Sequence, residues 1–257
     1  MRPTFPAGGF TNGDIFFNAD TPGVLSWISA DGSNYVADWV TLPGDGTNSE
    51  TNYVRGGLAF DQSGVYGGDL LVATGPSDGF PYEASPQNIY CVHSDRTVRW
   101  IASVNTKSLE GVCAVPNDPN RYHYLAGKII TADQGNNAVW AADTNGANGY
   151  TWGSYPAMTD FHIIPTNQDF YVVGSVNANA IFKVSRLYFQ DYVGDLLLTC
   201  EGRGDPFQYG ALYILHWDPE TADFKVVSTL TYPMGDTPDF ELGTFAPVPI
   251  PLISPQP

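Results

Sequence analysis

The stretch "GDLLVAT", from Gly68 to Thr74, is the clearest copy of a pattern that recurs along the chain. The pattern is a glycine, a polar residue and three apolar or nearly apolar residues, which suits one short buried strand. Other copies are "GDIFFNA" from Gly13, "GKIITAD" from Gly127, "GDLLLTC" from Gly194 and, without the glycine, "QDFYVVG" from Gln168. Recurrence of this kind predicts a repeat architecture.

Strand-like stretches also flank the copies. Ahead of most of them lies an apolar stretch closed by Pro or Asp, as in "RGGLAFD", "EGVCAVP", "DFHIIP" and "ELGTFAP". After most of them comes an alternating stretch that ends in Asp and a turn residue, such as "NIYCVHSDRT", and then a further strand such as "VRWIASV". Four such strands in a unit of about 50 residues are typical of β-propeller blades.

The sequence therefore predicts an all-β fold, a β-propeller of about five four-stranded blades. The copies from Gln168 and Gly194 lie too close together for a whole blade, so one blade must lack or borrow a strand, for which "RLYFQ" (186–190) is a candidate. The chain begins with a second-strand pattern and ends with a first-strand pattern. We therefore expect the C-terminal strand to close the ring by joining the N-terminal blade, which removes an exposed sheet edge. Residues 1–248 are then one propeller domain, and the Pro-rich residues 249–257 are a tail.

The chain is strongly acidic, with a formal net charge of −16 over 257 residues. This charge predicts no binding to nucleic acid, and the lack of any apolar run of about 18 residues predicts no insertion into a membrane. Two interpretations of the charge remain open: solubility in salty or extracellular surroundings, and acids gathered around a hard cation. The opening stretch "MRPTFPAGGF" has no long apolar segment, so any secretion signal has been removed or never existed. We expect an extracellular, periplasmic or cell-surface protein whose signal peptide is not present in this chain.

The three cysteines, Cys91, Cys113 and Cys200, lie in apolar strand-like stretches and fit no zinc spacing. We expect them to be small buried hydrophobic side chains. One disulfide with a spare thiol is the alternative.

Glu110 and Glu241 take the same place in their strands, each six residues before the closing proline. Arg55 and Thr159 take that place in the other two first strands, and Asp160 follows Thr159. Because innermost propeller strands line the central channel, we expect Glu110, Glu241 and Asp160 to hold a divalent cation there, with Ca²⁺ as the best match to oxygen ligands. Arg55 and Thr159 would line the same channel. The alternative is a structural ion pair between Arg55 and one of the acids.

A second candidate ring lies at the far ends of the strands that carry the glycine pattern. Its members come seven residues after each start of the pattern: Asp20, Gly75, Gln134, Ser175 and Glu201. Such polar positions fit a channel mouth that contacts a substrate, and they equally fit an ordinary transition from strand to turn.

His162 lies within the first-strand stretch "DFHIIP", close to Asp160, and is the candidate for proton transfer. A satisfied core histidine is the alternative. The other histidines, His93, His123 and His216, show no shared spacing, and the absence of a G-x-S-x-G motif disfavours a serine nucleophile.

The stretches "GLAFDQSGVYGGDLLVAT", "LEGVCAVPNDPNRYHYLAGKIITAD" and "FELGTFAP" resemble a group of uncharacterised secreted bacterial propellers. More broadly, the chain is similar to the NHL, virginiamycin-lyase-like and gluconolactonase-like propellers, best over residues 54–135. The resemblance implies a secreted propeller whose channel holds a divalent cation, and it implies no particular substrate. The Glu, Asn and Asp that gluconolactonase-like enzymes join at their metal do not map onto this chain, nor do the His and Glu of the lyase-like group.

Two functions from different classes follow from these observations. The first is a metal-dependent hydrolase or lyase that acts on a small sugar-like or lactone substrate, with His162 or a channel acid moving protons. The alternative is a non-catalytic module of a surface or secreted protein that binds glycans or protein partners, or is stabilised by calcium. The fold does not choose between them, because propellers serve all of these roles.

Overall fold

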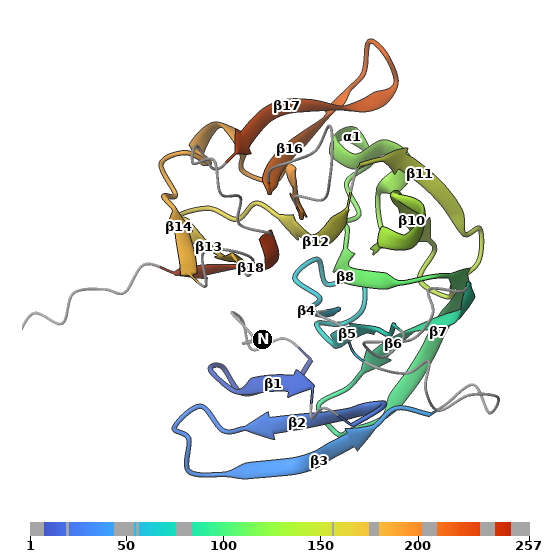
Figure 1. Ribbon diagram of the computed structural model, residues 1–257, viewed down its shortest axis with the longest axis vertical. Coiled ribbons are helices and arrows are strands. Elements are labelled where there is room, and N and C mark those ends of the chain that lie inside the picture. Colours follow the sequence, from blue (N-terminus) through green and yellow to red (C-terminus); the bar gives the residue numbers. More distant parts are fainter. Residues whose placement is uncertain are drawn as a thin grey trace, which may run out of the picture.

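The computed structural model describes residues 8–18, 21–43, 54, 57–75, 84–155, 157–174, 180–201, 210–231 and 240–247. For residues 241, 242 and 247 it describes the backbone alone. These residues form five antiparallel sheets of three or four strands that stand around a common centre as the blades of a β-propeller (Figure 1). The predicted all-β propeller of five blades is therefore confirmed.

The first three blades follow the chain in order. The first blade holds β1 (Ile15–Asn18), β2 (Val24–Ile28) and β3 (Tyr35–Thr41); the second holds β4 (Leu58–Phe60), β5 (Leu70–Ala73), β6 (Ser85–Val92) and β7 (Val98–Thr106); the third holds β8 (Leu109–Ala114), β9 (Ile129–Asp133), β10 (Ala138–Ala142) and β11 (Tyr150–Ser154). The glycine pattern becomes the second strand of the second and third blades, β5 and β9, as the sequence predicts. A single turn of α-helix, α1 (Pro119–Tyr122), and the 3₁₀ turn η2 (His123–Leu125) lie between β8 and β9.

The last two blades are interleaved in the chain. The fourth blade has the order β12 (Met158–Ile163), β15 (Leu196–Cys200), β16 (Ala211–Asp218) and β17 (Asp223–Thr231); the fifth has the order β18 (Phe240–Pro247), β13 (Gln168–Gly174) and β14 (Ala180–Val184). The hairpin β13–β14 is thus inserted between the first two strands of the fourth blade. This explains the short spacing between the copies from Gln168 and Gly194.

The C-terminal strand does not join the N-terminal blade, so the predicted closure of the ring is wrong. β18 pairs along its length with β13, where Phe170 lies opposite Phe245. The expectation that one blade borrows a strand is confirmed, but the borrowed strand is β18, whereas residues 186–190 form a turn and the start of η4 (Gln190–Tyr192). The physical reason is aromatic packing, because Phe245 contacts Phe170 and Phe189 at ring-centroid distances of 4.8 and 5.3 Å.

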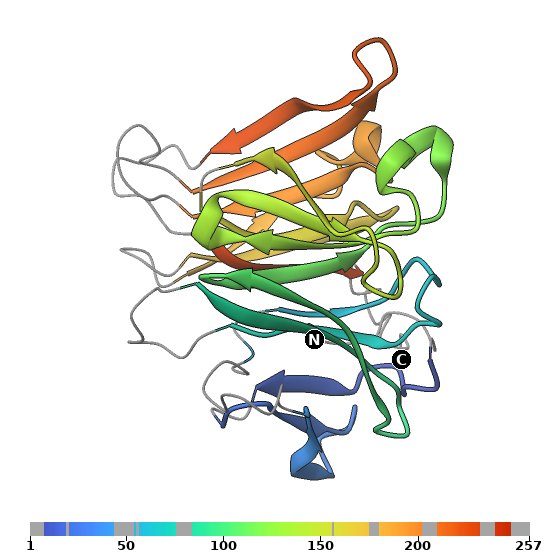
Figure 2. The ribbon, with the colours of Figure 1, turned by 90° about the vertical axis from the view of Figure 1, so that its right-hand side faces the viewer.

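Four hydrophobic clusters fill the spaces between neighbouring blades, and the side view shows the sheets stacked face to face (Figure 2). They join the first blade to the second, the second to the third, the third to the fourth and the fourth to the fifth. Among the described residues no such cluster joins the fifth blade to the first. All three cysteines are buried and free, which confirms the expectation of small hydrophobic side chains over that of a disulfide.

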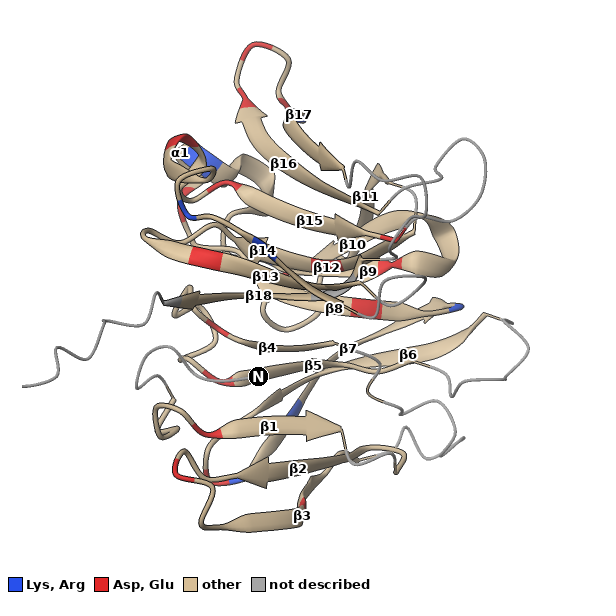
Figure 3. Ribbon diagram, turned by 60° about the vertical axis from the view of Figure 1, so that its left-hand side comes forward, with Lys and Arg blue, Asp and Glu red and all other residues tan. Residues whose placement is uncertain are grey.

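The polar residue of the glycine pattern has the same structural role in four of the blades. It lies within one residue of the start of the second strand and contacts a residue at the far end of the hairpin: Asp69 with His93, Lys128 with Asp143, Asp169 with Lys183, and Asp195 with His216. The four acids of the pattern, Asp14, Asp69, Asp169 and Asp195, are nearly fully buried. Several of the acidic residues drawn red in Figure 3 lie at the ends of strands. His93 and His216 therefore hold equivalent positions, so the expectation of unrelated histidines is wrong.

Candidate functional site

The innermost strands share an irregularity at the places that the sequence aligns. In β8, Glu110 and Gly111 face one residue of β9, because Leu109 pairs with Asp133 and Val112 with Thr131. In β12, one extra residue, Thr159, lies between two successive pairs with β15. In β18, the two residues 241 and 242 lie opposite one residue of β13. Such β-bulges re-aim side chains and occur often beside functional sites, so Glu110, Thr159 and Glu241 are equivalent positions in structure as in sequence.

At the level of these bulges, Asp160 of β12 lies against β8, the innermost strand of the neighbouring blade. A Cβ at Gly111 would fall 2.5 Å from Asp160 Cα and 2.7 Å from the Thr159 carbonyl oxygen, so only glycine allows β8 and β12 to approach this closely. Asp160 is 4% exposed and Glu110 is 9% exposed. Two of the predicted channel acids are therefore brought to adjacent strands near the axis.

The polar groups around these acids are largely engaged. Ser108 donates to Glu110 Oε1 at 2.9 Å, and the Phe161 amide donates to Asp160 Oδ1 at 2.9 Å. Thr159 Oγ1 lies 2.8 Å from Thr199 Oγ1 and donates to the Phe240 carbonyl oxygen of β18 at 3.0 Å. Thr159 thus ties the fourth blade to the fifth.

Two members of the second candidate ring, Gln134 and Glu201, lie near the first residues of β8 and β12. Gln134 opens the turn η3 (Gln134–Asn136) directly after Asp133, which pairs with Leu109. Glu201 is 6% exposed, and its amide donates to the Ala157 carbonyl oxygen at 2.8 Å. Asp20, Arg55 and Ser175 lie outside the described residues, as does the side chain of Glu241.

A pocket lies on the axis about four residues further along the innermost strands. Its walls come from the innermost strands of four blades: Ala59 and Phe60 of β4 with the following Gln62, Cys113 and Ala114 of β8, Phe161, His162 and Ile163 of β12, and Thr244 and Phe245 of β18. Its empty space, with the solvent at its mouth, is about 530 Å³. A concave site whose walls combine apolar side chains with a few polar groups is the usual form of a small-molecule site.

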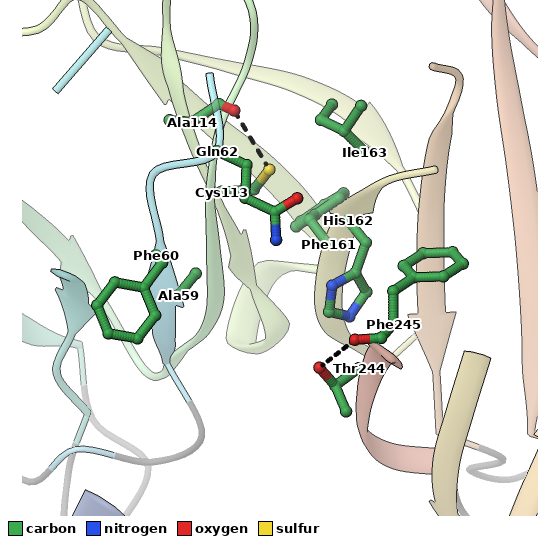
Figure 4. Close-up of a pocket in the computed structure, with 10 residues that line it drawn as sticks. All are labelled: Ala59, Phe60, Gln62, Cys113, Ala114, Phe161, His162, Ile163, Thr244 and Phe245. Carbon is green, nitrogen blue, oxygen red and sulfur yellow. Dashed lines mark hydrogen bonds between the residues drawn. The ribbon is translucent and has the colours of Figure 1, made fainter. Parts of the chain in front are cut away.

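Among the described wall residues, His162 has the only ionisable side chain other than a thiol, and the Asp160 carboxylate lies beside its ring. Its Nε2 lies 3.1 Å from Asp160 Oδ2, within ion-pair distance, although the angle does not make a hydrogen bond. The edges of Phe170 and Phe245 hold the ring, with centroid distances of 5.3 and 5.9 Å. Figure 4 shows the imidazole facing the centre of the pocket. The structure thus places the predicted proton-transfer residue in a pocket wall.

Gln62 is the second polar group that points into this pocket, toward the imidazole in Figure 4. The residue before it, Asp61, is 1% exposed and holds the loop rigidly. Its carboxylate accepts hydrogen bonds from the amides of Ser63, Gly64, Tyr66 and Gly68 and from the Ser63 hydroxyl. The sequence analysis missed Gln62, Thr244 and Phe245. Phe245 had an available signal, because it lies four residues after 241, one of the positions at which the first strands align, whereas Gln62 and Thr244 do not follow that spacing.

Cys113 places a thiol in the pocket wall, but not a nucleophile. Burial raises the pKa of this thiol far above its usual range, with the nearby Asp160 carboxylate adding to the effect. Since the thiolate is the reactive form, Cys113 acts as an apolar wall residue.

No protein-family model matches this chain, and no curated protein matches it. Within the described part of the chain, no helix is long and apolar enough to cross a membrane.

Proposed function

We propose that the axial pocket binds a small uncharged molecule that carries a carbonyl group, and that His162 moves a proton on the bound molecule. The observation that carries this proposal is the position of His162, in the wall of a pocket built from four blades and backed by a buried carboxylate. The aromatic and aliphatic walls favour an uncharged ligand, because none of the described wall residues offers a fixed charge to pair with.

The chemistry follows from which ring nitrogen faces Asp160. A carboxylate beside Nε2 favours the tautomer that carries its proton there, which leaves Nδ1 as the basic nitrogen. Nδ1 then takes a proton from a water molecule that attacks the carbonyl carbon, while the Gln62 amide donates a hydrogen bond to the carbonyl oxygen. When the tetrahedral intermediate collapses, the bond from the carbonyl carbon to the alkoxy oxygen breaks, and the imidazolium returns its proton to that leaving oxygen. Hydrolysis of a lactone or a simple ester is the reaction that these groups support best.

The test is a turnover assay with a panel of lactones and aryl esters on the purified chain. His162→Gln keeps a similar polar group but cannot act as a base, so the rate should fall by about 10²-fold or more. His93→Gln is the matched control, because His93 also contacts a buried aspartate but lies in another blade, outside the pocket. Turnover that survives in His162→Gln, or that is lost equally in His93→Gln, would remove His162 from the reaction. Binding without turnover would favour the non-catalytic alternative.

A divalent cation at the level of the bulges is a second candidate function, favoured by the shared register of Glu110 and Glu241. Among the described residues no group of three or more His, Cys, Asp or Glu side chains could hold a metal ion. Glu110 and Asp160 alone are too few ligands for Ca²⁺, which takes about six to eight oxygens. The cation proposal therefore rests on the third acid, Glu241, and no step of the proton transfer runs through it.

A calcium titration of chelator-treated protein tests this second candidate. If Glu110, Asp160 and Glu241 hold the ion, the melting temperature rises with calcium, and Glu110→Gln and Glu241→Gln each weaken that response. Equal responses in the wild type and both variants would exclude this site.

An extracellular location is also part of the proposal, and the net charge of −16 supports it.

A further inference from the structure

A second hollow lies away from the axis, where the third blade meets the fourth. Asn120 and Arg121 of α1 form one side, and His216 and Trp217 of β16 form the other. We call these four residues the outer site. Its empty space, with the solvent at its mouth, is about 500 Å³. The chain has 11 basic and 27 acidic residues, so the arginine of α1, drawn blue in Figure 3, is one of few basic side chains.

Asp195 is not one of the four lining residues, but its carboxylate brings the two basic side chains of the outer site together. Arg121 Nη2 lies 3.1 Å and His216 Nδ1 lies 2.9 Å from the same carboxylate oxygen, Oδ1. Asp195 itself is 4% exposed. Because both groups contact one buried atom, the guanidinium and the imidazole must lie side by side.

The guanidinium of Arg121 is fixed in position by the backbone of the fourth blade. Nη2 also donates to the Val193 carbonyl oxygen, and a Cβ at Gly194 would fall 2.9 Å from Nε. The side chain is still 38% exposed. Buried Nε has no hydrogen-bond partner among the described residues, and none of them accepts a hydrogen bond from Nη1. Arg121 therefore presents unused donors from a rigid position.

The imidazole of His216 has one nitrogen committed and one available. Nδ1 faces Asp195, so Nε2, on the opposite side of the ring, points away from that carboxylate, and the side chain is 52% exposed. A carboxylate beside Nδ1 favours the tautomer in which Nε2 is the acceptor. His216 thus offers an acceptor beside the donors of Arg121.

The equivalent pair in the second blade shows that this arrangement is not a general need of the fold. There His93 Nδ1 lies 2.7 Å from Asp69, and the other carboxylate oxygen accepts a weak hydrogen bond from the Cys91 thiol. No arginine joins that pair among the described residues. A purely structural link between the blades needs only the bonds of Arg121 and of Tyr122, whose hydroxyl donates to the Gly194 carbonyl oxygen at 2.5 Å. Such a structural link gives no role to His216 Nε2 or to the exposed side-chain amide of Asn120.

We propose that the outer site binds a short hydroxycarboxylate. The ligand carboxylate accepts hydrogen bonds from Arg121 Nη1 and the Asn120 amide, and the ligand hydroxyl donates to His216 Nε2. The site is separate from the axial pocket, and its ligand is independent of the reaction proposed there. Because the chain as a whole repels anions, the affinity is expected in the millimolar range at physiological salt.

The test follows amide chemical shifts of ¹⁵N-labelled protein during titration with glycolate, acetate and glycerol. Glycolate differs from acetate by one hydroxyl, so the pair isolates the contribution of His216. We expect saturable shifts at residues 120–121 and 216–217, with glycolate about fivefold to tenfold tighter than acetate and no saturation by glycerol.

Three variants decide the outcome. His216→Leu should reduce glycolate binding to the level of acetate, and Asn120→Ala, whose side chain makes no described hydrogen bond, should weaken both acids. His93→Leu, in the equivalent pair of the second blade, should change neither. Equal affinities for glycolate and acetate, no saturation by either, or an equal loss in His93→Leu would overturn the proposal and leave Arg121 as a structural link.

Discussion

Single residues near the axis decide how closely the innermost strands approach. Gly111 is the clearest case, because the space a side chain would need is taken by the backbone of β12 and the carboxylate of Asp160. The sequence predicts that Glu110 and Thr159 are equivalent from their distance to the closing proline, with Asp160 beside Thr159, and the structure places Glu110 and Asp160 on adjacent strands. The sequence does not indicate that residue 111 must be glycine, because the atoms that a side chain there would meet belong to another blade.

We predict that Gly111→Ala destabilises the protein by about 2–4 kcal/mol, since overpacking of a tight backbone contact forces β8 and β12 apart. Gly32→Ala is the control. Gly32 has a positive φ of 72° but nothing within 4 Å of its added Cβ, so its cost should stay near 1 kcal/mol. Denaturant unfolding measures both, and a smaller cost at 111 than at 32 would contradict the close approach.

At the level of strands, the repeated hairpin predicts which residues pair but not which blade a strand joins. His93 and His216 were missed as equivalents because the loops before them differ in length, so their spacing from the glycine pattern differs. Counting back from the strand ends, where "VHSD" and "LHWD" match, would have found them. The partner of β18 had no such signal, because every blade offers the same backbone edge and only the fit of Phe245 beside Phe170 and Phe189 selects β13.

The third blade carries the hairpin pair with its charges reversed, as Lys128 and Asp143, whose nitrogen and oxygen lie 2.5 Å apart. Lys128→Asp places two carboxylates opposite each other and should destabilise the fold. Adding Asp143→Lys restores an opposite pair in the polarity of the other blades. Because Asp143 is 38% exposed, we expect a coupling energy of only about 1 kcal/mol from the double-mutant cycle. A double variant no more stable than Lys128→Asp would show that the pair contributes nothing.

For the whole molecule, several carboxylates are stabilised in their charged form. The Lys225 ammonium holds the pKa of Asp218 at about 2, and the Ser33 amide and nearby hydroxyls hold that of Asp31 at about 2. Hydrogen bonds from Lys128 and Lys183 lower the pKa of Asp143 and Asp169. These groups bind protons more weakly in the folded chain than in the unfolded one.

Their contribution to stability is therefore present above the ordinary aspartate range and is lost as the pH falls through the lowered values. We expect the melting temperature to fall between about pH 4 and pH 2. A series of thermal melts across that range measures it. A melting temperature that climbs steadily toward pH 2 would show that relief of the acidic charge outweighs these pairs.

The axial pocket joins residues from four blades, so a measurement of ligand binding there tests the fold and the proposed function together. The most direct measurement is to titrate a library of small carbonyl compounds into ¹⁵N-labelled protein and map the amides that shift. We predict saturable shifts that converge on residues 59–62, 113–114, 161–163 and 244–245 for at least one lactone or ester. Binders whose shifts gather elsewhere on the molecule, or none in the whole library, would contradict a ligand site on the axis.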